Sequence, residues 1–348
     1  MITHWQQIDG QFTKTKKDDI DSRKPVWVDA RNVNRDEIQE LQEEYGIEQD
    51  HLMDILDPDE LSRMEDGEGY ILTIVRVPVY DPQAETPYLA VPVGIIIKGK
   101  IIITICWTDN EVLKDFGANR IRNVRLNDFP SFIVHILNRA NLNFLRYLKE
   151  INRRSTSIQN EMRMEVENKE ILLLLGLEKS LFTFTTSLKS NSLLLQKMKN
   201  TRLIKFDEDD LDFVEGVVID NRQAIEMADT YTNVLFAVID AFSSVTSNNL
   251  NVVMKKLAVI NLVMMAPTFV TSYFGMNFKL PFDNLAGYIP VICTSLLCLV
   301  SVGLSWALLS VNRSSIKNFR NQRKLSKKQK QKLKAEKKKI KKQEKKLK

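Results

Sequence analysis

One stretch of the chain places polar side chains at intervals of four and three residues without a break. Its ten positions are Asp240, Ser244, Ser247, Asn251, Met254, Ala258, Asn261, Met265, Thr268 and Ser272, which we call the polar stripe. These steps make a 3.5-residue repeat, which keeps one face of a helix towards a common axis in a left-handed supercoil. Six of the ten side chains carry a hydroxyl or amide group and one carries a carboxylate. Such oxygen dipoles can hydrogen-bond the water shell of a strongly hydrated cation such as Mg²⁺.

Two long uncharged segments indicate where this stripe lies relative to a membrane. No residue carries a charge over the 22 positions of Leu257–Phe278, nor over the 29 positions of Asn284–Asn312. A helix rises about 1.5 Å per residue, so roughly 20 apolar residues cross the core of a bilayer. Because only Lys279–Asp283 separates the two runs, they predict a helical hairpin in a membrane. Part of the polar stripe lies inside the first run, where polar groups are costly unless they face protein or water.

Two interpretations of the polar stripe are open at this point. Hydroxyl and amide groups can hold membrane helices together through hydrogen bonds. Alternatively, several copies of the stripe around one axis would form a pore lined with oxygen dipoles, which requires several subunits because each chain has two membrane segments. Met254, Met265 and the nearby Leu257 would then form apolar constrictions, which can gate by dewetting.

A short motif follows the first uncharged run. Tyr273-Phe274-Gly275-Met276-Asn277 resembles the YGMN signature of the CorA-type magnesium transporters. The segments Asn251–Leu257, Met265–Phe269 and Asp54–Glu65 are also similar to segments of that family. The motif is short, but its place between two membrane segments, after a striped helix and before a basic tail, makes the resemblance specific. The following loop Phe278–Leu285 departs from the family because it is poor in acidic residues.

The resemblance implies a homopentameric channel with a funnel-shaped cytoplasmic domain. Such a channel imports hydrated Mg²⁺ across the cell membrane under the membrane potential and is closed by intracellular Mg²⁺. Gly275, Met276 and Asn277 would form the selectivity entrance, where the Asn277 amide meets the hydrated ion. Lys255 and Lys256 resemble the basic collar around the inner mouth. The stripe and the resemblance together give these pore-lining residues: Asp240, Asn251, Met254, Leu257, Asn261, Met265, Thr268 and Ser272.

The sequence leaves alternatives for the ion and for its control. A Zn²⁺, Co²⁺ or Ni²⁺ transporter on the same scaffold is the first alternative, although the Gly-Met-Asn triplet favours Mg²⁺ and no Cys or His cluster suits zinc or copper. In the family, Mg²⁺ bound between cytoplasmic subunits holds the channel closed, and Asp212 and Glu215 are candidate ligands on one side of such a site. These acids, like those of Asp54–Glu68, can instead be solvated residues at helix ends.

Residues 1–127 predict a cytoplasmic α/β domain with a mixed sheet. A strand is expected at Val26–Ala30, followed by a helix from its cap Asn34 to Tyr45 and a second helix at Gln49–Leu56. The segments Tyr70–Val79 and Leu89–Cys106 are rich in Val and Ile and predict three or four strands with hairpin character.

The rest of the chain predicts helices, so the fold class is an α+β membrane protein. A helical hairpin at 128–206, with a break near Glu165–Asn168, precedes a long stalk helix at 207–275 that begins with four acidic residues. That helix is expected to continue as the first transmembrane helix at about 254–275. The remaining expected parts are an external loop at 276–287, a second transmembrane helix at 288–311 and a basic cytoplasmic tail at 312–348.

Charge is divided unevenly along the chain. Residues 313–348 hold 18 Lys or Arg and two Glu, a net of +16, which leaves residues 1–312 at −10. A basic segment directly after a membrane helix marks the cytoplasmic side, and two crossings place the N-terminus on the same side. Met1–Asp18 is polar without a signal-peptide pattern, which agrees. We expect anionic lipid at the tail and no nucleic acid, although Lys-rich runs can bind nucleic acid.

No motif indicates an enzyme. The chain lacks a phosphate-binding loop and a nucleophile elbow, and its three Cys and three His have no metal-ligand spacing. The alternative from another class is a membrane-anchored scaffold whose stalk only oligomerises. Asn and Thr at membrane depth in the polar stripe argue against it.

Overall fold

The structure is a computed structural model that describes residues 1–84, 86–162, 168–276, 288, 292–293, 295–304 and 307. The chain divides into two compact units, Met1–Ser243 and Ser244–Lys348. The first unit contains the whole sheet and the helices α1 to α5. The second contains the C-terminal part of α6 and a short apolar helix, Ser295–Leu304.

Seven strands form one mixed sheet in the order β2-β1-β3-β7-β6-β5-β4. Neighbouring strands β3 and β7 are parallel, with Val26 opposite Ile101, and the other neighbouring pairs are antiparallel. The mixed sheet expected from the sequence is therefore present. The strands are β1 (Ile2–Ile8), β2 (Gln11–Thr15), β3 (Val26–Arg31), β4 (Arg63–Gly67), β5 (Tyr70–Tyr80), β6 (Tyr88–Lys98) and β7 (Ile101–Cys106).

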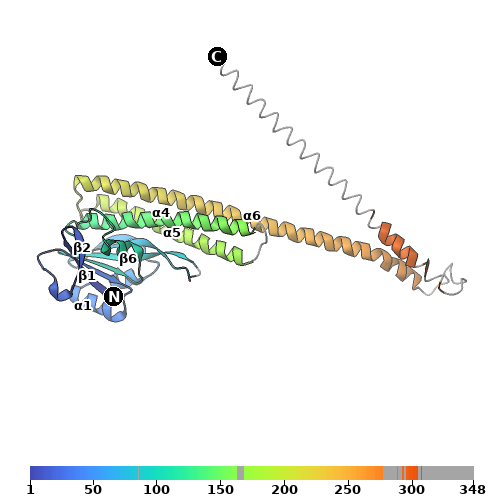
Figure 1. The fold of residues 1–348 in the computed structure, drawn as a ribbon, viewed down its shortest axis with the longest axis horizontal. Helices are drawn as coiled ribbons and strands as arrows, with labels where there is room; N and C mark the ends of the chain where they lie inside the picture. Colours follow the sequence, from blue (N-terminus) through green and yellow to red (C-terminus); the bar gives the residue numbers. More distant parts are fainter. Residues whose placement is uncertain are drawn as a thin grey trace, which may run out of the picture. The chain divides into compact units, whose positions relative to one another are not determined.

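Helices cover both faces of the sheet (Figure 1). On one face α1 (Arg35–Tyr45) and α2 (Gln49–Leu56) share a core with Val26 and Val28 of β3. On the other face α3 (Glu111–Gly117), α4 (Phe129–Met162) and α5 (Asn168–Asn200) share a core with Trp27 of the same strand. Burial on both faces explains why the central strands are continuous Val and Ile runs, because neither face needs polar residues.

The helix starts follow from local sequence. Asn34 caps α1 through a reciprocal pair of hydrogen bonds: its side chain accepts from the Glu37 backbone N–H, and the Glu37 carboxylate accepts from the Asn34 N–H. This capping box satisfies N–H groups that have no partner inside the helix. Gly46 ends α1 with a φ of 59°, a left-handed conformation that glycine adopts without strain.

The three long helices expected from the sequence are present as α4, α5 and α6 (Glu208–Phe274). Within the first unit, Val214, Val217 and Leu235 of α6 are buried in the core shared with α4 and α5. The helix α5 is apolar and long enough to resemble a membrane span, but 39% of its most apolar window is buried in the chain. Its buried residues, such as Leu177, Phe184 and Leu188, belong to the core of the first unit.

Four elements of the structure, β1, β2, β4 and α3, were not predicted from the sequence. The hairpin of β1 and β2 turns at Asp9 and Gly10, with φ values of 49° and 79°. Asp-Gly is a strong signal for a two-residue hairpin loop, and it was available in the sequence. The strands themselves were missed because β1 and β2 contain few apolar residues, although Phe12 of β2 is buried against Trp27. The expected break near Glu165–Asn168 lies mostly outside the described residues.

Candidate functional site

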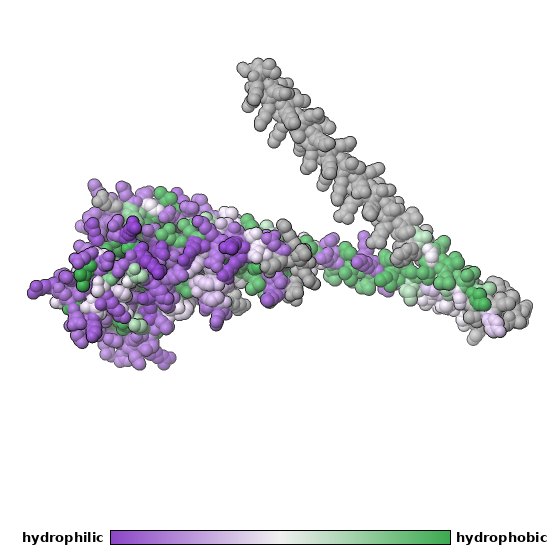
Figure 2. All heavy atoms as spheres, viewed as in Figure 1, coloured by the Kyte–Doolittle hydropathy of each residue, from purple (hydrophilic) through white to green (hydrophobic). Residues whose placement is uncertain are grey.

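All eight residues expected to line a pore lie on α6, and all of them are exposed. Asp240 belongs to the first unit, and the other seven belong to the second. The apolar members are as exposed as the polar ones: Met254 is 58% exposed, Leu257 50% and Met265 65%. Figure 2 shows that apolar side chains gather over this C-terminal part of α6. The second unit thus presents an uncovered surface on which apolar and polar side chains alternate.

The opposite side of the same helix segment is partly covered. At about 100° per residue, Val259, Val263 and Val270 lie on the side of α6 opposite Asn261, and each is only partly exposed. The thiol of Cys298, in the short apolar helix, lies 3.9 Å from the carbonyl oxygen of Pro267. The described part of the second apolar helix therefore packs against the side of α6 that faces away from the stripe.

Hydroxyl groups near Pro267 donate their hydrogens within the helix. Thr268 Oγ1 donates to the Met264 carbonyl at 2.8 Å, and Thr271 Oγ1 lies 3.1 Å from the Pro267 carbonyl. The Thr268 oxygen therefore presents its acceptor capacity outward along the stripe. Waters bound to a cation turn their hydrogens away from the ion, so they need acceptors from a surrounding wall. The chemistry of Thr268 suits a hydrated cation.

The end of α6 carries the first part of the Gly-Met-Asn motif. Gly275 donates its N–H to the Thr271 carbonyl at 2.9 Å, which continues the helical pattern by one residue. A Cβ atom at this position would lie 3.2 Å from the same carbonyl oxygen, closer than ordinary van der Waals contact, so glycine fits this helix end best. Met276 is 59% exposed. The expected loop at 276–287, including Asn277, lies outside the described residues except for Met276 at its start.

Lys255 and Lys256 are exposed on α6 between two apolar residues, Met254 of the polar stripe and the nearby Leu257. No ion pair within the described part of the chain neutralises either ammonium group. A cationic pair is therefore present at the start of the uncharged run. The expected tail at 312–348 lies outside the described residues, so the structure does not relate it to this pair.

The two regulatory candidates near the start of α6 differ in their contacts. Glu215 forms an ion pair with Lys199 of α5 at 3.1 Å and is 65% exposed. Asp212 is exposed, one helical turn earlier, and takes part in no ion pair among the described residues. Positions three apart lie on the same face of a helix, so both carboxylates can be reached from one side.

The other acid-rich segment, Asp54–Glu68, is folded around one guanidinium. Arg63 binds Asp54 at 2.6 Å and Glu65 at 3.0 Å, and it also pairs with Glu60. These carboxylates are thus partly neutralised inside one chain. Among the described residues, no group of three or more His, Cys, Asp or Glu side chains is arranged to hold a metal ion.

Comparison with known proteins gives one matching family. The family model described as "CorA-like Mg2+ transporter protein" matches residues 22–317. The cobalt/magnesium transport protein CorA of Methanocaldococcus jannaschii is 27% identical over 286 residues, which cover 79% of this chain and 88% of that protein.

Solved structures match the fold as well. The complete structure of the CorA magnesium transporter from M. jannaschii aligns with a TM-score of 0.71 and 23% identity, covering 87% of this chain and 96% of that one. The cytoplasmic domain of ZntB from Vibrio parahaemolyticus aligns with a TM-score of 0.53 and 12% identity, covering 71% of this chain and 98% of that domain. The fold expected from the sequence, an N-terminal α/β domain with a long helix and apolar helices as candidate membrane spans, is confirmed by these matches.

Proposed function

Because the chain belongs to the family of CorA-like Mg²⁺ transporters, we propose that it forms a homo-oligomeric channel that imports hydrated Mg²⁺ and is closed by intracellular Mg²⁺. Membership of the family makes it a membrane transporter of divalent cations. The choice of Mg²⁺, the assembly into a pentamer, the direction of transport and the cytoplasmic position of both termini are parts of the proposal.

One observation carries the proposal: the polar stripe and the packed side of α6 lie on opposite sides of the helix. A stripe that held the hairpin together would face the second apolar helix. Instead the described contact, between Cys298 and Pro267, lies on the other side. Side-by-side copies of α6 around an axis would line a pore with Asn251, Asn261 and Thr268. Mg²⁺ keeps several of its waters, and these oxygen-bearing groups can bind that shell without stripping it.

Two apolar members of the polar stripe and the nearby Leu257 would form the narrow points of the pore. Met254, Leu257 and Met265 interrupt the polar groups with exposed apolar side chains. Rings of such side chains would exclude water when the helices lie close together, and would conduct when they move apart. Asn277 would select the hydrated ion at the outer mouth, and Lys255 and Lys256 would repel cations at the inner mouth until the stalks separate.

Closure would depend on Mg²⁺ between subunits. A divalent ion that bridges Asp212 and Glu215 to acidic groups of a second copy stabilises only the arrangement that brings them together. We expect the double variant Asp212→Asn/Glu215→Gln to need more Mg²⁺ for protection against protease. Asp220→Asn/Glu226→Gln, on the same helix and with the same charge change, is the control. Identical protection curves in both variants would leave these two acids as solvated residues.

The direct test is ion uptake into liposomes that contain the purified protein. Asn251 lies on the stripe, whereas Asn249 is also exposed but lies about 200° away around the helix. We expect Asn251→Leu to slow Mg²⁺ uptake roughly tenfold, which corresponds to about 1.4 kcal/mol in the barrier. Asn249→Leu should leave the rate near that of the unaltered protein. Equal losses, or none, would remove the stripe from the conduction path.

The entrance is tested separately. Asn277→Ala should abolish Mg²⁺ uptake while the oligomer, measured by native mass spectrometry, stays intact. Uptake at an unchanged rate would refute this role of Asn277.

Uptake measured in the same liposomes would identify the transported ion. The relative from M. jannaschii is named for cobalt and magnesium, so that name does not choose between the two ions. We expect Mg²⁺ to be carried faster than Zn²⁺, Co²⁺ or Ni²⁺ at equal concentration and membrane potential. Faster uptake of Zn²⁺ would favour the alternative transporter, and absence of any uptake would favour the membrane-anchored scaffold.

A further inference from the structure

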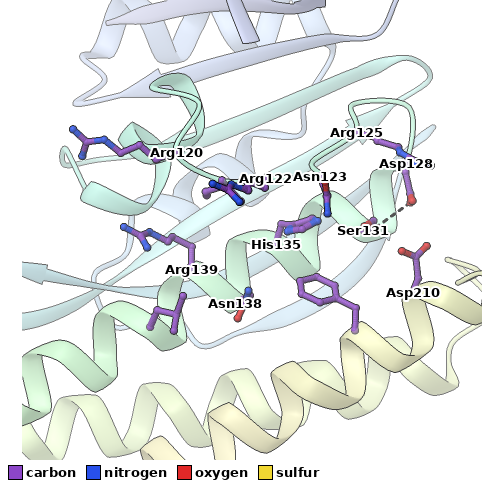
Figure 3. Close-up of a pocket in the computed structure, with 13 residues that line it drawn as sticks. Arg120, Arg122, Asn123, Arg125, Asp128, Ser131, His135, Asn138, Arg139 and Asp210 are labelled. Atoms are coloured by element: carbon purple, nitrogen blue, oxygen red, sulfur yellow. Dashed lines mark hydrogen bonds between the residues drawn. The ribbon is translucent and has the colours of Figure 1, made fainter. Parts of the chain in front are cut away.

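A pocket of about 680 Å³ lies in the first unit, far in the sequence from the polar stripe. It is bounded by the loop after α3, the first turns of α4 and the start of α6 (Figure 3). This volume is within the range of about 300–1,000 Å³ that is usual for small-molecule sites. Four arginines line it: Arg120, Arg122, Arg125 and Arg139. Such a concentration of positive charge is unexpected, because residues 1–312 carry a net charge of −10.

The arginines at one end are positioned by a buried acid. The carboxylate of Asp115, only 3% exposed, accepts a hydrogen bond from Arg120 Nη1 at 3.0 Å and one from Arg139 Nε at 2.7 Å. One carboxylate therefore holds two guanidinium groups, which leaves one positive charge in excess. Arg122 and Arg125 are exposed, and no ion pair within the described part of the chain involves them.

The other end of the pocket is acidic. Asp128 caps α4 by accepting from the Ser131 N–H at 3.1 Å, and Asp210, from the first turn of α6, approaches it (Figure 3). Burial, together with the nearby Asp210 carboxylate, raises the pKa of Asp128. Two carboxylates this close repel each other unless a proton or a cation lies between them. In Figure 3, Arg120 and Arg139 lie at the opposite end from this pair.

His135 and Phe213 lie between the two ends of the pocket. His135 is 9% exposed, and its ring packs on the Phe213 ring with centroids 4.6 Å apart. Burial lowers the pKa of His135, which favours the neutral form of its imidazole. Arg120 and Arg139 therefore lie at one end of the pocket and the Asp128–Asp210 pair at the other, with Arg122 nearer the centre and Arg125 on the side of Asp128 (Figure 3).

We propose that this pocket binds a small polyphosphate as its Mg²⁺ complex, with the phosphate oxygens on Arg120, Arg122 and Arg139 and the metal between Asp128 and Asp210. The planar fork of an arginine matches phosphate oxygens in pairs. Mg²⁺ in proteins is usually held by one or two carboxylates together with phosphate oxygens. A bare anion would be repelled by the aspartates and a bare cation by the arginines, whereas the complex satisfies both ends. The site goes beyond the proposed transport function and does not depend on it.

The test is equilibrium binding of ATP to the full-length purified protein, measured by calorimetry with and without Mg²⁺. We expect saturable binding that Mg²⁺ strengthens. The double variant Arg122→Gln/Arg125→Gln should weaken binding about tenfold, because it removes the Arg122 contact to phosphate and the positive charge of Arg125 from the same pocket. The matched control is Arg23→Gln/Lys24→Gln, which removes the same charge from another exposed loop and should bind normally.

Two further measurements locate the metal and the phosphates. Asp210→Asn should abolish the strengthening by Mg²⁺ while ATP still binds, and pyrophosphate should compete with ATP. Equal binding by the pocket variant and its control, or no saturable binding at millimolar ATP, would refute the proposal. If the pocket variant instead alters the oligomer in native mass spectrometry without altering ATP binding, the arginines contact a second copy of the chain and the proposal is wrong.

Discussion

Replacing Arg76 with methionine should destabilise the first unit. Its guanidinium is buried, with the residue only 5% exposed, and it donates to four neutral acceptors. These are Ser187 Oγ at 3.0 Å and the carbonyl oxygens of Pro58 at 2.8 Å, Glu60 at 2.6 Å and Ala90 at 2.6 Å. The side chain thereby joins the acid-rich loop before β4 to the strands and to α5. Burial lowers the pKa of Arg76, and Asp59 and Asp57 partly oppose this.

The expected loss of unfolding free energy follows from the acceptors that would lose the Arg76 donor. The Ala90 carbonyl and the Ser187 hydroxyl are buried and would lose a donor, at a cost of about 1–3 kcal/mol each. The loop carbonyls of Pro58 and Glu60 are nearer to solvent and can accept from water instead. Methionine also removes the cost of burying a charge, which offsets part of the loss. A net loss of about 2–4 kcal/mol is therefore expected.

Urea unfolding of a fragment comprising residues 1–243 would measure this loss, with the fluorescence of its tryptophans, which include the buried Trp27, as the signal. Arg23→Met, at an exposed position, should change the free energy of unfolding by no more than about 0.5 kcal/mol. Hydrogen exchange should accelerate at Asp57–Glu60 in the Arg76 variant. A variant as stable as the unaltered fragment would refute the reasoning, because it would show that these four hydrogen bonds contribute nothing beyond the cost of burying the charge.

Two further predictions concern proton binding and gating. Burial raises the pKa of Asp29 to about 6 from its ordinary 3.8. The stability that the protonated Asp29 contributes is therefore present below about pH 4 and is lost as the pH rises through about 6, by up to about 3 kcal/mol. The difference in unfolding free energy between the unaltered fragment and Asp29→Asn should show this slope from pH 4 to 7, and a constant difference would contradict it. Met265→Ser should raise basal Mg²⁺ flux at high internal Mg²⁺ several-fold by easing wetting of the pore, whereas Met264→Ser, about 100° away on the same helix and 60% exposed, should not.

Elements with strong local signals could be predicted from the sequence. Asn34 and the acids that follow it mark the start of α1, and the structure has the expected cap at that residue. The Val and Ile runs of β5 to β7 indicated buried strands, which the sheet confirms. Strands without an apolar pattern, such as β1, could not be found in this way, because their place is fixed by pairing with β3 across the fold.

The polar stripe and the arginine-lined pocket differ, for the same reason, in how far the sequence could predict them. The polar stripe is periodic along a single helix, so the sequence alone places its members on one face. The pocket joins Arg122 of a loop, Arg139 of α4 and Asp210 of α6, which no sequence spacing relates. Only packing of α4 and α6 on the same core brings these residues together. Its signal in the sequence was limited to the Arg-rich loop before α4, and a charge run of that kind usually indicates only a solvated surface.

We infer self-association from the alternation of apolar and polar side chains along the polar stripe. If Asn261 faced lipid, its amide would lose its hydrogen bonds to water, which is costly at membrane depth. The described part of the second apolar helix packs on the other side of α6, near Pro267, and so leaves Asn261 uncovered. Other copies of α6 can shield both Asn261 and the neighbouring Met265 from lipid if they enclose water at the amide. The described part of one hairpin does not do this, so we infer that the feature that would conduct the ion also requires the oligomer.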